Sequence, residues 1–245
     1  MSAIPPSSHE PPAPAPPIAG ALLVATAPAP GAPEAEALLW RDLRGRPLAA
    51  WSLGALLAAP GVAVVVIVAR PERAAQAEAL AASSPTARVV LSEPDWRASL
   101  AAGLATLPDA CEWVIAHDAA RPLITPATLT TGLDAARQGG AALAGEPVKD
   151  TLKRVADGRV IETLPRSRLT RLQPPLVIRR DLLARALRAP GAVGLAGLAL
   201  ASGAQVRVYH PNGPNPAVTS DAEWAVVETL LGEARDGGAE GVARP

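Results

Sequence analysis

The sequence is poor in aromatic side chains and in lysine. It has no phenylalanine, five tryptophans and one tyrosine among 245 residues, and Lys149 and Lys153 are its only lysines. With so few aromatic rings, a stacking platform for single-stranded nucleic acid is hard to assemble. The 23 basic residues are balanced by 23 acidic ones, so no overall field attracts nucleic acid or an anionic membrane. We therefore expect no nucleic-acid partner.

Cysteine and long apolar runs are also scarce. The single Cys111 excludes an internal disulfide, and with three histidines it gives no zinc-ligand spacing. The longest apolar run, 61–69, is far shorter than the ~20 residues that a membrane helix needs. The N-terminus lacks the basic segment and apolar core of a secretory signal. We expect a reducing, cytoplasmic compartment and no membrane association.

Between two irregular tails, the sequence alternates strand-like and helix-like segments. The proline-rich residues 1–17 and the Gly-, Ala- and charge-rich residues 232–245 predict disordered tails. The alternation over 18–231 predicts one α/β domain with a parallel sheet and helices on both faces. Ligands of such sheets bind outside the carboxyl ends of the strands. The expected strands are 20–25, 62–69, 88–91, 113–116, 141–144, 172–178 and 205–209, and the expected helices are 47–58, 71–82, 95–107, 126–137, 180–187 and 220–231.

One segment breaks this alternation. Residues 151–155 and 159–163 form two alternating patterns around Asp157-Gly158, and Asp-Gly between such patterns is a strong hairpin signal. A hairpin inserted into a parallel α/β domain projects from it, so we expect an arm.

The residues best suited to catalysis or ligand binding are His117-Asp-Ala-Ala-Arg-Pro122, directly after the expected strand 113–116. A carboxylate at the end of a strand with a cation three residues later suits a divalent metal beside a phosphate. Asp118 and Arg121 could equally pair with each other or cap the next segment. The sequence leaves both interpretations open.

These residues belong to a longer set of motifs. The set comprises Gly45-Arg-Pro-Leu, Trp51-Ser-Leu, His117 to Pro122, Pro147-Val-Lys-Asp-Thr-Leu-Lys153, Glu162-Thr, Arg166-Ser-Arg-Leu169 and Gln173-Pro174. In order and spacing it resembles the 2-C-methyl-D-erythritol 4-phosphate cytidylyltransferase family from about residue 20 to residue 231. That resemblance implies a Rossmann-like nucleotidyltransferase fold, and a reaction of CTP with methylerythritol phosphate that releases pyrophosphate in the non-mevalonate isoprenoid pathway. It also implies a homodimer that exchanges the β-arm, here 148–168.

The resemblance also implies roles for individual residues. Asp118 matches the catalytic aspartate that binds a divalent cation such as Mg²⁺. The implied substrate-binding residues are Arg121 and Arg166 on the acceptor's phosphate, Thr151 reaching the partner's site, Ser99 near the cytosine pocket, and Thr219 in the segment Asn215–Thr219.

The donor side departs from the family. Where the family has a glycine-rich phosphate loop and a lysine, this chain has the segment Ala25–Leu39, which contains three prolines and no cation, with Glu34 and Glu36 where a cation is expected. Proline removes the N–H donors that such a loop aims at phosphate. Ala217 replaces a second lysine, and loss of one preorganised stabiliser costs roughly 2.7–4 kcal/mol of barrier. Two further departures are the apolar Gly194–Leu200 in place of an acidic segment, and Pro174 in place of a threonine.

Three hypotheses follow from this contrast. The first is a cytidylyltransferase whose activity is weakened or lost. The alternative is a non-catalytic dimeric homologue with a scaffold or regulatory role, and a weaker idea is a nucleotidyltransferase with another acceptor. Arg41, Arg44 and Arg46 could replace the missing donor cations, although Gly45-Arg-Pro fits a solvated surface turn better.

Overall fold

The computed structural model describes residues 18–26 and 35–236. The predicted tail 1–17, the centre of the donor segment (27–34) and the end of the C-terminal tail (237–245) lie outside the described residues.

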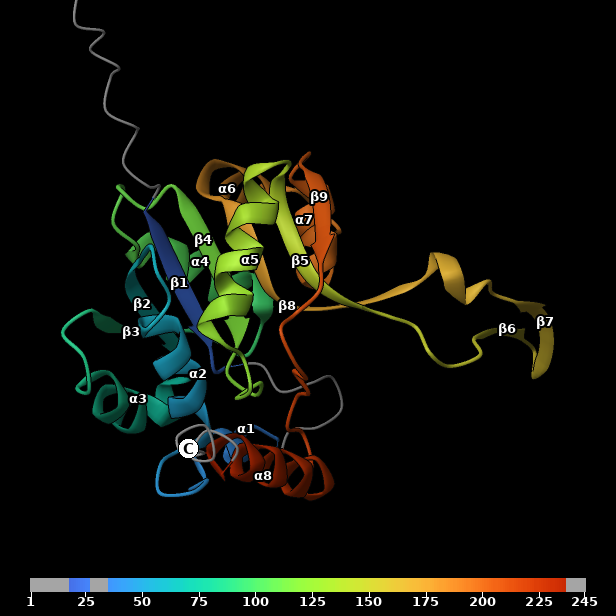
Figure 1. The fold of residues 1–245 in the computed structure, drawn as a ribbon. Coiled ribbons are helices and arrows are strands. Elements are labelled where there is room, and N and C mark those ends of the chain that lie inside the picture. The colour runs from blue at the N-terminus through green and yellow to red at the C-terminus, as the bar shows by residue number, and fades with distance from the viewer. Residues whose placement is uncertain (1–17, 27–34, 237–245) are drawn as a thin grey trace, which may run out of the picture.

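A seven-stranded sheet forms the centre of the molecule, with the order β3-β2-β1-β4-β8-β5-β9 (Figure 1). The predicted α/β class is confirmed, and so is the arrangement of helices on both faces. The expected all-parallel sheet is wrong at one strand, because β8 runs antiparallel to both β4 and β5. The chain returns from the arm straight into β8 without a crossover helix, and antiparallel neighbours need none. The strands are β1 (Ala19–Val24), β2 (Val62–Ala69), β3 (Ala87–Leu91), β4 (Trp113–Asp118), β5 (Gly140–Pro147), β8 (Thr170–Arg179) and β9 (Gln205–Tyr209).

Helices cover both faces of the sheet and bury two aliphatic cores. On one face lie α2 (Leu48–Leu57), α3 (Ala74–Ala81) and α5 (Pro126–Arg137). On the other lie α4 (Trp96–Thr106), α6 (Arg180–Arg188) and α7 (Gly194–Ala201). All six residues of β1 are buried, which explains why the central strands are continuous apolar runs.

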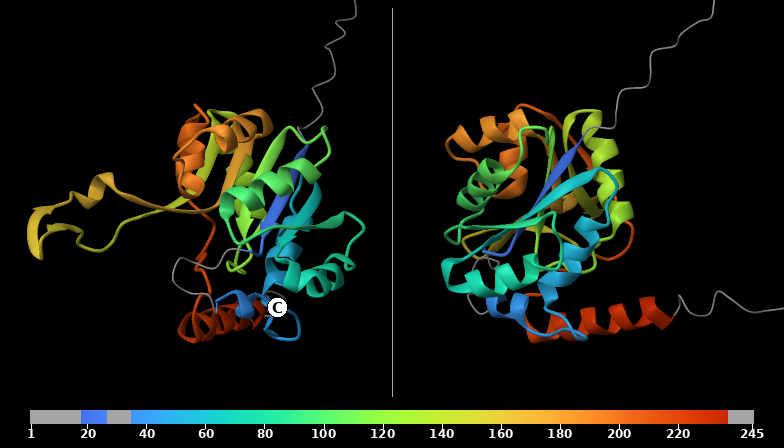
Figure 2. Two further views of the ribbon diagram at one scale, coloured as in Figure 1. Left: turned by 180° about the vertical axis from the view of Figure 1, so that it is seen from behind. Right: turned by 90° about the vertical axis from the view of Figure 1, so that its left-hand side faces the viewer.

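Two helices lie together below the edge where the parallel strands end (Figures 1 and 2): α1 (Ala35–Trp40) and α8 (Asp221–Asp236). Sequence patterning missed α1, because its six residues follow a proline-rich stretch. Helix α8 starts as predicted, with Ser220 and Glu223 bonded in a capping box. It runs to Asp236, beyond the predicted end at Leu231, so residues 232–236 continue the helix.

The arm projects from the sheet as a separate two-stranded hairpin (Figures 1 and 2). It consists of β6 (Lys153–Ala156) and β7 (Arg159–Thr163), and the short 3-10 helix η2 (Arg166–Arg168) follows. Asp157 and Gly158 form the predicted turn, with φ values of 49° and 74°. Both angles lie in the left-handed region that this hairpin turn requires.

Candidate active site

The candidate site lies at the edge of the sheet where β1 and β4 end. Val24 pairs with Asp118 across these two parallel strands. Because β8 is antiparallel, its first half lies at the same edge and brings Gln173 close to Arg121. The site therefore joins residues from three strands and from the loop after β4.

Asp118 is held by its own loop. Its Oδ1 accepts a hydrogen bond from the Ala120 N–H at 2.9 Å, and its Oδ2 lies 3.8 Å from Arg121 Nε. Burial raises the pKa of the Asp118 carboxyl, while the Ala120 N–H and Arg121 act in the opposite direction. The structure thus contains the pairing of Asp118 with Arg121. The metal-binding role of Asp118 stays a prediction.

Arg121 ties the loop to two other segments. Its Nη1 donates to Gln173 Oε1 at 3.0 Å and to the Asn215 carbonyl at 2.5 Å. Its carbonyl accepts from Ser52 Oγ at 3.0 Å and lies 3.1 Å from His117 Nε2. Burial lowers the pKa of His117 to about 3, so this imidazole is neutral at physiological pH. Arg121 is therefore fixed in place before any ligand binds.

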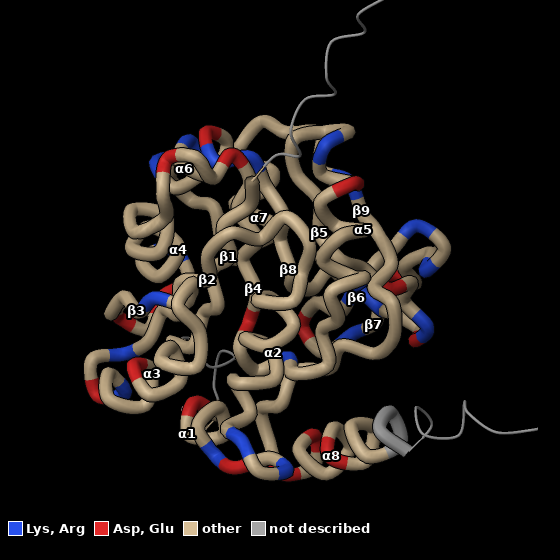
Figure 3. Tube along the Cα trace, turned by 60° about the vertical axis from the view of Figure 1, so that its left-hand side comes forward, with Lys and Arg blue, Asp and Glu red and all other residues tan. Residues whose placement is uncertain are grey.

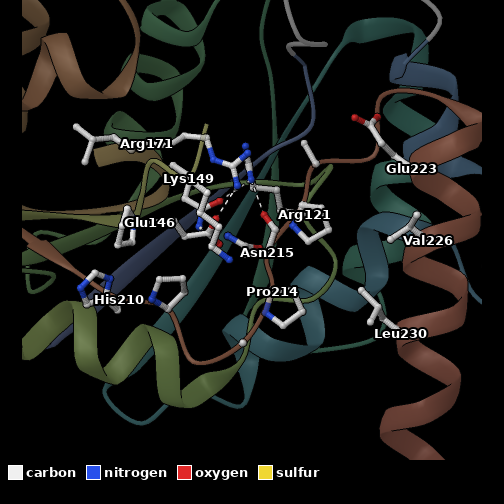
Figure 4. Close-up of a pocket in the computed structure, with 17 residues that line it drawn as sticks. Arg121, Glu146, Lys149, Arg171, His210, Pro214, Asn215, Glu223, Val226 and Leu230 are labelled. Atoms are coloured by element: carbon white, nitrogen blue, oxygen red, sulfur yellow. Dashed lines mark hydrogen bonds and ion pairs between the residues drawn. The ribbon is translucent and has the colours of Figure 1, made fainter. Parts of the chain in front are cut away.

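A cavity of about 800 Å³ opens beside Arg121, between the sheet edge and α8 (Figure 4). Lys149 and Arg171 also line it, and they add positive charge at the base of the arm. Arg171 Nη2 donates to Glu146 Oε2 at 2.6 Å, and this hydrogen bond is the main cause of the lowered Glu146 pKa. Glu146 and Glu223 line the cavity as well, so three cationic side chains face two carboxylates. The remaining excess of positive charge suits an anionic ligand such as a phosphate.

Sequence reasoning did not select Lys149, Arg171 or Glu146 as site residues. A signal was present, because Glu146 and Lys149 both come shortly after the expected strand 141–144, at its carboxyl end. In the structure, Glu146 is the next-to-last residue of β5. Gln173 entered only as part of a motif. Its place in the site follows from the antiparallel direction of β8, which the sequence did not reveal.

Ser99 is brought to the same edge from the other side of β1. It is fully buried in α4, and its Oγ lies 2.5 Å from Thr26 Oγ1 at the end of β1. Asp95 caps α4 by accepting from the Ala98 N–H at 2.8 Å, which fixes the start of this helix.

Three other predicted residues do not join Asp118 within this chain. Thr151 and Arg166 lie on the exposed arm, where Arg166 Nη1 donates to the Lys149 carbonyl at 2.7 Å. Thr219 donates its N–H and its hydroxyl to Glu223 Oε2 at 2.7 and 2.6 Å. Its hydroxyl therefore helps to start α8. The substrate-binding roles of all three stay predictions.

On the donor side, Glu36 forms ion pairs with two arginines of the same chain. Glu36 is buried and accepts from Arg70 Nη1 at 2.9 Å and from Arg73 Nε at 3.1 Å. Its carboxylate thus neutralises two arginines beyond the end of β2.

The arginines that could have replaced the donor cations are also in contact with their surroundings. Arg41 pairs with Asp221 at 2.7 Å and stacks over the Trp224 ring, with 4.5 Å to its centroid. Arg46 stacks over Trp51 at 3.5 Å. Arg44 has a φ of 57° in the turn before α2, as the interpretation of a surface turn predicts.

A divalent cation would find a limited ligand set here. Within residues 18–26 and 35–236, no group of three or more His, Cys, Asp or Glu side chains could hold a metal ion. Mg²⁺ is commonly held by one or two carboxylates, several waters and the substrate's phosphates. The Asp118 carboxylate fits that role. In the part of the chain that the structure describes, no helix is long and apolar enough to span a membrane.

Comparison with known proteins identifies the family to which this chain is similar. The model of the 2-C-methyl-D-erythritol 4-phosphate cytidylyltransferase family matches residues 23–233. A protein of that name from Dehalococcoides mccartyi strain 195 is 30% identical over 203 residues, which cover 80% of this chain and 89% of the relative. One from Cereibacter sphaeroides strain KD131 is 35% identical over 196 residues, covering 78% and 87%.

Solved structures share the fold at lower sequence identity. The 4-diphosphocytidyl-2C-methyl-D-erythritol synthase of Anaerococcus prevotii superposes with a TM-score of 0.77 at 19% identity, covering 88% of this chain and 98% of the other. The cytidylyltransferase of Thermus thermophilus gives 0.67 at 23% identity, covering 87% and 98%. At these identities the likeness shows the fold.

Proposed function

The chain belongs to the 2-C-methyl-D-erythritol 4-phosphate cytidylyltransferase family, and from that premise we propose that it binds a phosphomonoester beside Arg121 and transfers cytidylyl groups only weakly. The observation that carries this proposal is the contrast in cations. Arg121, Lys149 and Arg171 line one cavity, whereas Arg41 and Arg46 on the donor side are held against tryptophan rings.

The chemistry explains why the missing cations matter. In-line attack on the α-phosphorus of CTP builds negative charge that fixed cations and a metal stabilise. Mg²⁺, held by Asp118 and the substrate's phosphates, would supply part of that stabilisation. Ala217 lines the cavity and brings no charge. Each missing stabiliser costs roughly 2.7–4 kcal/mol of barrier, although such losses are not additive.

A second candidate is a non-catalytic dimeric homologue with a scaffold or regulatory role. The observation that favours it is Glu36, whose buried carboxylate occupies Arg70 and Arg73. Under this hypothesis the chain binds no CTP.

The two candidates are separated by titrating the full chain with CTP and Mg²⁺ in a calorimeter and by measuring pyrophosphate release with methylerythritol phosphate present. Weak CTP binding with slow release supports the first candidate, and Asp118→Asn should then lower the metal-linked affinity. Absence of CTP binding to the folded protein supports the second. CTP binding that Asp118→Asn leaves unchanged would remove the metal role of Asp118.

Both candidates include a homodimer formed through the arm. Val155, Val160 and Ile161 on the hairpin are each more than half exposed, which is unusual for apolar side chains grouped together. Deleting 148–164 should give a monomer in light scattering. A dimer that persists after this deletion would refute the exchanged arm.

A further inference from the structure

Glu146 is an acidic side chain that lies among the cations of the cavity of about 800 Å³ beside Arg121 (Figure 4). Its Oε2 accepts from Arg171 Nη2 at 2.6 Å, and its Oε1 accepts from Gln173 Nε2 at 3.3 Å. The Oε1 atom of Gln173 in turn accepts from Arg121 Nη1 at 3.0 Å. One carboxylate is therefore bonded directly to one cation of the cavity and joined to a second through a single amide.

The Glu146 carboxylate is ionised and accessible to a ligand. The hydrogen bond from Arg171 is the main cause of its lowered pKa, and the amide of Gln173 and the positive charge of Lys149 act in the same direction, outweighing the effect of burial. The Glu146 side chain is 33% exposed. An anion that enters the cavity therefore meets a full negative charge as well as the cations.

A second carboxylate, that of Glu223 on α8, also lines the cavity but has a different task. Its Oε2 accepts from the N–H and the hydroxyl of Thr219 at 2.7 and 2.6 Å and from the hydroxyl of Ser220 at 3.2 Å. These bonds fix the start of α8. The donors to Glu146, by contrast, are side chains that themselves line the cavity.

The part of the chain beside this cavity is strongly basic. Residues 148–171 contain seven Lys and Arg residues and three Asp and Glu residues, although the whole chain is neutral (Figure 3). A cationic site attracts an anion more strongly with each charge that the anion carries. Without an opposing charge, the cavity would hold a polyphosphate, such as the triphosphate of a nucleotide, more tightly than a phosphomonoester.

Glu146 supplies that opposing charge. A single phosphoryl group can be held by Arg121 and Lys149, whereas a second phosphoryl group needs Arg171, whose charge Glu146 already neutralises. We propose that Glu146 is a specificity-determining residue that makes this cavity select phosphomonoesters over polyphosphates. The inference rests on the proposed binding of a phosphomonoester beside Arg121, and it names the residue that sets the ligand class. The cavity then stays free for the acceptor while a nucleotide is present.

The test is calorimetric titration of the full chain with inorganic phosphate at about pH 8 and at one fixed ionic strength. Pyrophosphate is measured by its displacement of bound phosphate, so that only the shared cavity is reported. The wild type should bind pyrophosphate no more tightly than phosphate. Glu146→Gln removes the charge and keeps a carbonyl acceptor for Arg171. It should tighten pyrophosphate binding about tenfold and phosphate binding by about threefold or less.

The readout is the ratio of the two affinities, because a general loosening of the cavity would weaken both anions alike. Tighter binding of pyrophosphate than of phosphate by the wild type, or the same ratio in Glu146→Gln, would overturn the inference and leave the proposed phosphate binding intact. Failure of phosphate to bind the wild type would overturn both.

Two further variants separate the position of the charge from its mere presence. Asp134→Asn removes an exposed carboxylate on α5 that pairs with Arg137 at 2.7 Å and does not line the cavity. It should leave the ratio unchanged. Glu146→Asp keeps the charge on a shorter side chain and should keep the wild-type ratio to within about twofold. Equal shifts of the ratio in Asp134→Asn and Glu146→Gln, or a shift in Glu146→Asp as large as in Glu146→Gln, would overturn the role of Glu146.

Discussion

The charged side chains have different surroundings on the acceptor side of the candidate site, around Arg121, and on its donor side, around Glu36 and Arg41. On the acceptor side, Arg121 is held rigidly by Gln173 and Asn215 and still lines a cavity. On the donor side, Glu36 closes an internal ion-pair cluster with Arg70 and Arg73, and Arg41 covers a tryptophan. Ion pairs occur on both sides, because Arg121 lies 3.8 Å from Asp118 and Arg171 pairs with Glu146. The difference is that Arg121 and Arg171 also share a cavity of about 800 Å³ with Lys149. This contrast is the basis of the proposed function, in which the acceptor side binds a phosphomonoester and the donor-side charges stabilise the fold.

The sharpest way to break this comparison is to remove the fixed cation. Arg121→Ala leaves Asp118 and the acceptors on Gln173 and Asn215 without their donor, and we expect a loss of about 3 kcal/mol in the free energy of unfolding together with loss of phosphate binding. Arg171→Ala is the matched control, because its side chain is 71% exposed. It should weaken phosphate binding but lower stability by at most about 1 kcal/mol. Denaturant unfolding of both variants measures the difference, and equal losses would contradict the structural role of Arg121.

The donor side can be tested at its buried carboxylate. The Glu36 side chain is 7% exposed between two arginines that are each about a third exposed. Glu36→Gln should therefore cost about 2 kcal/mol of unfolding free energy. Glu72→Gln breaks another contact of Arg70, at 3.2 Å and with a 65% exposed carboxylate, and should cost less than about 1 kcal/mol. Similar values for the two variants would show that Glu36 does not anchor this side.

A pH titration probes the interior beneath the acceptor side. The pKa of His117 falls from 6.5 to about 3 on folding because of burial. Between these values the unfolded state binds a proton that the folded state does not, so stability decreases as the pH falls below 6.5. The contribution reaches about 1.4 kcal/mol per pH unit. The raised pKa of Asp118 acts in the opposite direction, at pH values above its ordinary 3.8.

The His117 contribution is measured by denaturant unfolding between pH 6.5 and about pH 5, with the wild type compared with His117→Asn. The wild type should lose stability over this range more steeply than His117→Asn, which cannot titrate there. Parallel curves for the two proteins would show that His117 is not held neutral by the fold.

Much of the fold follows from local sequence patterns. Buried strands such as β2 are apolar runs, and the arm's turn follows from the residues Asp157-Gly158, whose preference is local. The direction of β8 does not follow, because it depends on how the chain returns from the arm. The short helix α1 was missed because tertiary contacts stabilise it: Leu39 is buried in the core, and Glu36 reaches Arg70 and Arg73.

The site was predictable only in part for the same reason. Asp118 and Arg121 stand close together in sequence, so their pairing could be foreseen as one of two alternatives. The contact between Arg121 and Gln173 joins residues on separate segments, and it requires the antiparallel β8. The interpretation of Glu36 as a charge opposed to the nucleotide could not anticipate the two arginines that neutralise it. Contacts between distant segments set the charge that a ligand meets.

The smallest expected effect concerns Arg41, a donor-side arginine that contacts α8. Its pair with Asp221 is exposed, with 52% and 85% of the two side chains accessible, and its guanidinium lies over Trp224. Arg41→Ala should therefore cost about 0.5–1 kcal/mol of unfolding free energy and leave the CTP titration unchanged. A variant with unchanged stability and weaker CTP binding would mean that Arg41 leaves Trp224 to meet the nucleotide. The donor side would then have a working cation, and the two halves of the site would differ in the distance that a side chain must move and not in function.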